Sequence, residues 1–153
     1  MEQQYLADSN TIIDYISNKM HDKASLILDG YFNDNLTISI ISKIEVLGFN
    51  GEDDELKRLA DFIDLATVIF VDNAIADKTI ELRKAYRIKL PDAIIAATAL
   101  VYELILITRN IHDFKNITGI ICIDPYALLI KSKQFFISNG FTNYFQVTAI
   151  NAS

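Results

Sequence analysis

The chain has 153 residues, 51% of them hydrophobic, and a formal net charge of −6. This length and composition suit one domain with a sizeable core and argue against disorder. The negative charge argues against a protein that coats nucleic acid with a basic face. It does not exclude a nuclease, because acidic residues that hold cations are less negative than a residue count suggests.

Cysteine usage and the apolar segments bound the cellular setting. Cys122 is the only cysteine, which excludes a disulfide framework and a cysteine-based zinc site and fits a reducing cytoplasm. The first ten residues lack the basic and then apolar layout of a signal peptide. The longest apolar passage, residues 93–107, contains polar interruptions and is too short to span a bilayer as a helix. We therefore expect a soluble, cytoplasmic protein.

Short apolar runs alternate with helical patterns in the first half of the chain. Capping residue types separate the first run from the first helix, and Gly51 interrupts the pattern after the third helix. The predicted elements are a strand from Tyr5 to Ala7, a helix over TIIDYI, a helix from about Asp22 to Tyr31, a strand from Leu36 to Ile41, and a helix that is capped by Ser42 and carries Ile44 to Phe49.

The second half continues this alternation around one strongly apolar helix. Pro91 suits the first helical position, Asp92 suits the first turn, and the residues that follow are almost all apolar, so this helix should be central. The predicted elements are a helix from Asp53 to Leu65, a strand from Thr67 to Val71, a helix from Asn73 to Tyr86, the central helix, a strand from Leu104 to Ile107, a loop or short helix from Thr108 to Phe114, and a strand from Ile120 to Ile123.

This order predicts an α/β fold with a central, mostly parallel sheet flanked by helices on both faces. In such folds, sites gather at the carboxyl ends of the strands. We expect one domain over residues 1–130. The aromatic-rich residues 131–153 form an expected C-terminal extension, packed on the domain or at an interface.

Four acidic residues follow strands or lie on the helices that leave them: Asp8, Glu45, Asp92 and Asp113. Taken singly, each has a structural explanation as a helix cap, an exposed helix residue, a helix-dipole partner or a turn residue. Taken together, they raise an electrostatic problem. Two like charges about 4 Å apart repel by on the order of 4 kcal/mol at an effective dielectric constant near 20.

Bound cations, or raised pKa values, would relieve this repulsion. Oxygen-only ligands suit Mg²⁺ or Mn²⁺, and the chain has only two histidines for a zinc or non-haem iron site. Such a site suits phosphodiester hydrolysis. No nucleophilic serine or cysteine arrangement and no phosphate-binding glycine loop competes with this interpretation.

Four segments together resemble the PIN-domain ribonucleases, and among them the VapC toxins of bacterial and archaeal type II toxin–antitoxin pairs. The segments are YLADSNTIIDYI, SKIEVLGF with Glu45, KLPDAIIAATAL with Asp92, and ITRNIHDF with Asp113. The resemblance implies a PIN-like fold and a Mg²⁺- or Mn²⁺-dependent endoribonuclease that cuts RNA, with transfer RNA or ribosomal RNA as plausible targets.

The resemblance also implies roles for individual residues. Asp8, Glu45, Asp92 and Asp113 would be catalytic and hold the metal. Asn10 and Thr108 match supporting polar positions, and Arg109 is a candidate phosphate contact. Asn110 stands where some relatives carry a further acid, so the resemblance leaves open one ion or two. The implied partners are a cognate antitoxin protein and a second copy of the chain in a homodimer.

Two alternatives remain at this point. One is a PIN-like fold kept for binding after its catalytic activity was lost. The other is a receiver-type signalling domain, which is also a small parallel α/β protein with an acidic pocket. A receiver should carry a lysine after its final core strand, but Asp124 and Pro125 follow the last predicted strand here.

Overall fold

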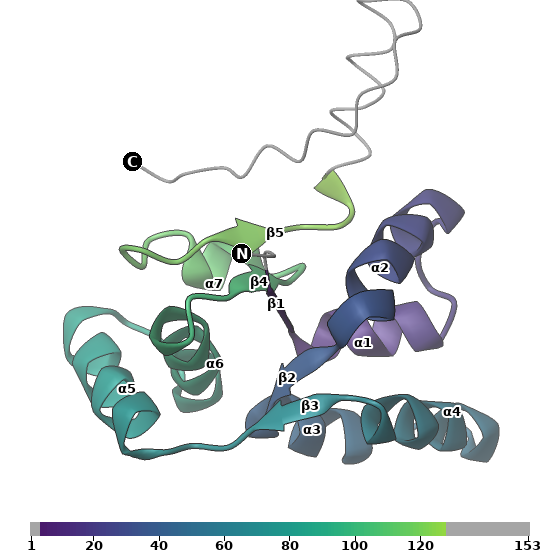
Figure 1. Ribbon diagram of the computed structural model, residues 1–153, viewed down its shortest axis with the longest axis horizontal. Helices are drawn as coiled ribbons and strands as arrows, with labels where there is room; N and C mark the ends of the chain where they lie inside the picture. Colours follow the sequence, from purple (N-terminus) through teal and green to yellow (C-terminus); the bar gives the residue numbers. More distant parts are fainter. Residues whose placement is uncertain (1–3, 128–153) are drawn as a thin grey trace, which may run out of the picture.

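Five parallel strands form the centre of the described part of the fold (Figure 1). The computed structural model describes residues 4–127. The strands pair in the order β3-β2-β1-β4-β5, so the first strand of the chain lies in the middle of the sheet. They are β1 (Tyr5–Ala7), β2 (Thr37–Ser39), β3 (Thr67–Ile69), β4 (Ile105–Ile107) and β5 (Cys122–Ile123).

Seven helices in the described part of the chain connect these strands and confirm the predicted alternation. Most differences from the prediction lie at the ends of elements: β1 has its predicted bounds, the other four strands are shorter than predicted, and the second helix is longer. The helices are α1 (Ser9–Ile16), α2 (Asp22–Asn35), α3 (Ile40–Leu47), α4 (Asp53–Asp64), α5 (Asn73–Ala85), α6 (Leu90–Val101) and α7 (Ile111–Phe114).

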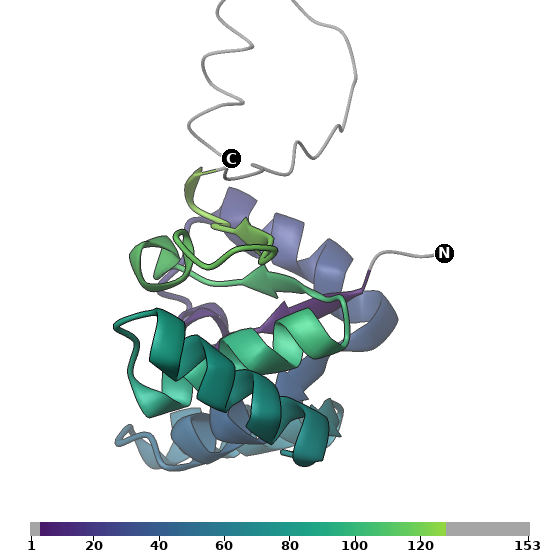
Figure 2. The same ribbon diagram turned by 90° about the vertical axis from the view of Figure 1, so that its left-hand side faces the viewer.

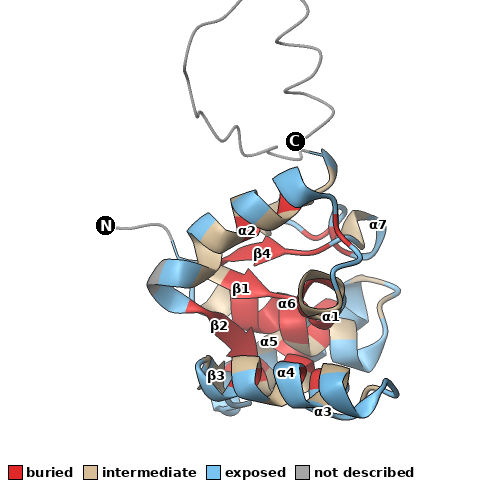
Figure 3. Cartoon of the chain, turned by 90° about the vertical axis from the view of Figure 1, so that its right-hand side faces the viewer, coloured by how far each residue is buried: buried red, intermediate tan, exposed pale blue. Residues whose placement is uncertain are grey.

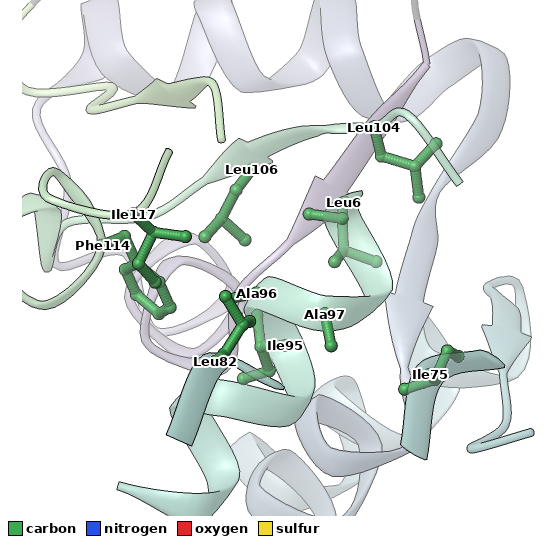
Figure 4. Close-up of a cluster of buried hydrophobic side chains, with 11 residues drawn as sticks. Leu6, Ile75, Leu82, Ile95, Ala96, Ala97, Leu104, Leu106, Phe114 and Ile117 are labelled. Carbon is green, nitrogen blue, oxygen red and sulfur yellow. The ribbon is translucent and has the colours of Figure 1, made fainter. Parts of the chain in front are cut away.

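Side chains that alternate along the strands build a hydrophobic core on each face of the sheet. On one face, Leu6 and Leu106 pack against α5, α6 and the segment around α7, as Figure 4 shows. On the other face, Ala7 and Ile38 pack against α1, α3 and α4, and Ile107 packs against α2. Figures 2 and 3 show these two layers of helices from opposite sides, and the burial colours of Figure 3 mark the buried strands and α6.

The starts of α1, α3 and α6 differ from the prediction by one turn or less, and α1 begins at Ser9, two residues before TIIDYI. Ser39, not Ser42, is the N-cap of α3, and its side chain accepts a hydrogen bond from the Ile41 amide at 3.2 Å. Ser42 is instead fully buried inside the helix. Because Ser39 already caps α3, strand β2 ends at Ser39 and is shorter than predicted. Helix α6 begins at Leu90, which puts Pro91 at its second position, where the missing N–H is still tolerated.

The direction of helix α6 along the sheet determines where the first turn of this helix, and with it Asp92, lies. Only three residues separate its last residue, Val101, from the start of β4 at Ile105, so its C-terminal end lies near the amino ends of the strands. Its N-terminal end therefore lies near their carboxyl ends. From Ala93 onward most of its residues are buried, and the helix contributes four residues to the core shown in Figure 4: Ile95, Ala96, Ala97 and Ala99.

No helix in residues 4–127 is long and apolar enough to cross a membrane. The predicted domain boundary at residue 130 and the predicted extension over residues 131–153 lie outside the described residues.

The core on the α6 face should dominate stability. We predict that Leu106→Ala lowers the free energy of unfolding by about 2–5 kcal/mol, because the fully buried Leu106 side chain would leave a cavity beneath α6. Leu65→Ala is the matched control: Leu65 is 81% exposed, and the same truncation should cost about 0.5 kcal/mol or less. Urea unfolding followed by circular dichroism measures both, and equal effects would contradict the assignment of this core.

Candidate functional site

The carboxyl ends of β1 and β4 bring Asp8 and Thr108 together. The Asp8 amide donates to the Ile107 carbonyl at 3.0 Å, which continues the pairing of the two strands by one residue. Asp8 is also the N-cap of α1. Its side chain is therefore fixed at the junction of a central strand and a helix, and Asp8 is only 5% exposed.

Hydrogen bonds hold both oxygens of the Asp8 carboxylate. The Ser9 amide donates to Oδ1 at 2.8 Å, and the Thr108 hydroxyl donates to Oδ2 at 2.7 Å. Burial raises the pKa of Asp8, and the negative charge of Glu45 adds to this effect, whereas the hydrogen bonds from Thr108 and Ser9 oppose it. Thr108 thus lies directly beside the first of the predicted acids.

Ser9 links Asp8 to the second predicted acid. Glu45 lies on α3 and is exposed, and its Oε2 accepts a hydrogen bond from the Ser9 hydroxyl at 2.5 Å. The same hydroxyl lies 3.4 Å from Asp8 Oδ1. The sequence alone indicates Ser9 only as one of several capping residue types. Its position directly after Asp8 is the available signal for a role between the two acids.

The charges of the other three predicted acids raise the pKa of Asp92. It lies in the first turn of α6 and is partly buried. Burial is the largest cause that raises its pKa, followed by the charges of Asp113, Asp8 and Glu45, while Lys89 lowers it. The fold therefore brings the charges of the three other predicted acids within electrostatic reach of Asp92.

The fourth acid is held by its own helix turn. Asp113 is exposed on α7, and the Asn110 side-chain amide donates a hydrogen bond to its Oδ2. The Asn110 backbone amide also donates to the Thr108 hydroxyl at 3.0 Å. Asn110 therefore connects the support of Asp8 with the orientation of Asp113.

A hollow of about 310 Å³ is lined by Asn10, Asp14, Arg109 and Asn110, and Asn110 connects it to Asp113. Arg109 forms an ion pair with Asp14, and its guanidinium lies 5.3 Å from the centre of the Tyr126 ring. In this arrangement Arg109 is committed to protein partners. Asn10 is exposed at the hollow and lies close to Asp8 in sequence.

The donor set fits a hard divalent cation by chemistry, since all four predicted ligands are carboxylates. Their present arrangement is looser than a formed site: within residues 4–127, no three His, Cys, Asp or Glu side chains converge closely enough to hold an ion. Glu45 and Asp113 are exposed and are bonded to Ser9 and Asn110. These two side chains would need to turn from these partners to face an ion shared with Asp8 and Asp92.

The chain is similar to a known protein family and to several solved structures. The family model of the PIN domain matches residues 5–120. A toxin–antitoxin complex from Klebsiella pneumoniae contains a chain that is 33% identical, with a TM-score of 0.67, over 80% of this chain and 98% of that one. No curated protein matches.

A second solved structure is the DNA-bound VapBC of Salmonella typhimurium. One chain of that structure is 27% identical to this chain, with a TM-score of 0.66, and the match covers 81% of this chain and 99% of that one. VapBC-1 from nontypeable Haemophilus influenzae, at 22% identity and a TM-score of 0.66 over 81% and 99% of the two chains, shows likeness of fold alone.

Repulsion by the neighbouring acids should make the negative charge of Asp92 destabilise the fold when no cation is present. We predict that Asp92→Asn raises the melting temperature by a few degrees in EDTA, because it removes a partly buried charge that three carboxylates repel. Differential scanning calorimetry measures this change. Asp64→Asn, an exposed residue at the end of α4, is the matched control and should have little effect.

The sign of the pH dependence follows from the raised pKa of Asp92. Well below the ordinary value of 3.8, Asp92 is protonated in both the folded and the unfolded chain, so wild type and Asp92→Asn should differ little. As the pH rises through the raised pKa, the folded wild type loses stability relative to the variant. A stability difference that shrank with rising pH would contradict the assigned repulsion.

Thr108 should stabilise the charged form of Asp8. We predict that Thr108→Val lowers the free energy of unfolding at neutral pH by about 1–3 kcal/mol, because it keeps the shape of the side chain and leaves a buried carboxylate oxygen without its donor. Thr108→Ser retains the hydroxyl and should recover most of the loss. Urea unfolding compares the three proteins, and equal losses in both variants would assign the effect to packing.

Proposed function

Because the chain belongs to the PIN domain family and is VapC-like, we propose that it is a metal-dependent endoribonuclease and the toxin of a type II toxin–antitoxin pair. The observation that carries this proposal is the position of Asp92 at the carboxyl ends of the strands. The negative charges of three other acids act on its carboxylate there. A cluster of this kind stabilises positive charge and repels a bare phosphate, so it requires cations to bind RNA.

We propose that Asp8, Glu45, Asp92 and Asp113 hold one or two Mg²⁺ or Mn²⁺ ions. Carboxylate oxygens are preferred ligands of both ions. When bound, such an ion supplies the Lewis acidity that activates water and stabilises charge developing on the phosphate. This requirement gives the four acids a common role that none of their separate structural explanations provides.

The residues around the acids orient them for this role. Thr108 and the Ser9 amide fix both oxygens of Asp8, so its remaining lone pairs have defined directions. The Ser9 hydroxyl holds Glu45 beside it. The positive end of the α6 dipole favours the negative charge of Asp92. The fixed orientation of Asp8 lowers the cost of assembling the site, whereas Glu45 and Asp113 would have to turn towards the ion.

The hollow that Asn110 connects to Asp113 is a candidate place for the scissile strand. Asn10 and Asn110 present amide groups there, which can donate hydrogen bonds to phosphate oxygens. Arg109 would have to leave Asp14 to make the phosphate contact expected from the sequence. The Asn110 side-chain amide is likewise bonded to Asp113, so Asn10 is the better placed residue for that contact in this arrangement.

The similar solved structures support one of the proposed partners, the antitoxin. The Klebsiella pneumoniae neighbour is part of a toxin–antitoxin complex, which supports an antitoxin partner for this chain. We further propose a homodimer that acts in the cytoplasm, with transfer RNA or ribosomal RNA as the substrate.

The receiver-type alternative is wrong. Receiver domains have the strand order 2-1-3-4-5, whereas this sheet has the order β3-β2-β1-β4-β5, and the PIN domain matches residues 5–120. A PIN domain kept only for binding remains the second candidate, and activity distinguishes it from the nuclease.

Cleavage of total bacterial RNA tests the nuclease proposal. We predict new RNA ends with wild type and Mn²⁺, no cuts with EDTA, and a loss on the order of 100-fold or more with Asp92→Asn, because a metal ligand contributes at least as much as the residues that orient one. Asp64→Asn is the matched control for the same chemical change and should cut like wild type. Mapping the new ends identifies the target.

Two outcomes would contradict the proposal. Cuts that persist in EDTA or in Asp92→Asn would remove the metal or this acid from the reaction. A folded wild type that cuts no RNA in the presence of Mn²⁺ would favour the binding-only candidate.

A further inference from the structure

Positive charge is concentrated where α5 ends and α6 begins. Four exposed cations within seven residues form what we call the basic strip: Arg83, Lys84, Arg87 and Lys89. The ion pairs found in residues 4–127 involve Lys57, Lys78 and Arg109, and none of them includes a residue of the basic strip. In a chain with a net charge of −6, this grouping calls for an explanation.

The fold places the basic strip beside the acids. Helices α5 and α6 pack antiparallel, since the Tyr102 hydroxyl at the end of α6 donates to Asp72 at the start of α5 at 3.0 Å. The C-terminal end of α5 therefore lies near the first turn of α6, which carries Asp92. Figure 2 shows these two helices side by side across one face of the sheet.

A second connection fixes the strip to the segment after α7. The Tyr86 hydroxyl donates to the Thr118 hydroxyl at 3.2 Å and accepts from the Thr118 amide at 3.1 Å. Tyr86 lies between Lys84 and Arg87 of the strip, and Thr118 follows the helix that carries Asp113. The strip is thus connected to the start of α6, which carries Asp92, and to the segment that follows α7.

Lys89 occupies a position that the fold alone would assign to another residue type. It is the N-cap of α6 and makes no side-chain capping hydrogen bond. Ser, Thr, Asp and Asn are favoured at this position, and a cation there is opposed by the helix dipole. A residue that breaks a local rule is a candidate for function. Its positive charge acts on Asp92 across one helical turn.

We propose that the basic strip binds the phosphodiester backbone of the RNA next to the bond that the acids cut. Phosphates are the complement of four cations that form no ion pair within residues 4–127, and the strip would attract a strand that the acidic site itself repels. The inference rests on the proposed ribonuclease function, because it assigns this surface to the substrate of that site.

RNA binding in EDTA tests the strip without requiring cleavage. The probe is a short fluorescein-labelled single-stranded RNA of mixed sequence, followed by anisotropy over a series of NaCl concentrations. The test variant replaces Arg83, Lys84, Arg87 and Lys89 with Gln. The matched control replaces Lys19, Lys23, Lys57 and Arg58 with Gln, which lowers the net charge equally on other exposed surfaces.

We expect the strip variant to bind at least about 10-fold more weakly and to reduce the slope of log affinity against log salt by about 0.7 for each phosphate that it no longer neutralises. The control should retain the wild-type slope. Equal weakening in both variants, or no weakening in the strip variant, overturns the proposal. Because the assay needs no cutting, a chain that binds through the strip but never cleaves RNA would overturn the nuclease proposal alone.

A single substitution separates binding from folding. Lys89→Ser introduces a favoured capping residue and removes a cation from the helix N-terminus, so it should raise the melting temperature in an Asp92→Asn background, where no charge at residue 92 is left without Lys89. We expect the same variant to bind the RNA probe several-fold more weakly. Weaker binding with higher stability supports the strip, and unchanged binding overturns the role of Lys89 in it.

Discussion

The buried carboxylate of Asp8 is the constraint on which the site depends. It lies at the end of the central strand, where one carboxylate oxygen is bonded to the following amide and the other to Thr108 from the neighbouring strand. A charge in this position is costly unless its hydrogen bonds are complete. The register of β1 against β4 therefore determines both the stability of this edge and the orientation of the acid.

Much of the fold could be predicted because its signals are local. Apolar runs separated by capping residues indicate the strands and helices, and the apolar composition of α6 indicates that it is the central helix. The strand order could not be predicted this way, because short parallel strands carry little information about their neighbours. Ser39 was missed as a cap because both it and Ser42 fit the same local pattern, and only the length of β2 distinguishes them.

The candidate site was predicted in part for the same reason. Four acids at expected strand ends indicate a cluster, and the structure brings their charges together around Asp92. The roles of Ser9 and Asn110 depend on distances between segments far apart in the sequence, such as the 2.5 Å contact between Ser9 and Glu45. The pairing of Arg109 with Asp14 is also a tertiary contact, and no pattern in the sequence indicates it.

The burial of α6 has a consequence for how the site moves. Amide hydrogens in such a central helix exchange with solvent only when large parts of the domain open. Asp92 is attached to this buried helix, whereas Glu45 and Asp113 are exposed on short helices. The site therefore combines one rigid half with one adaptable half, so that adjustment to a ligand falls to the exposed acids while the central one stays in place.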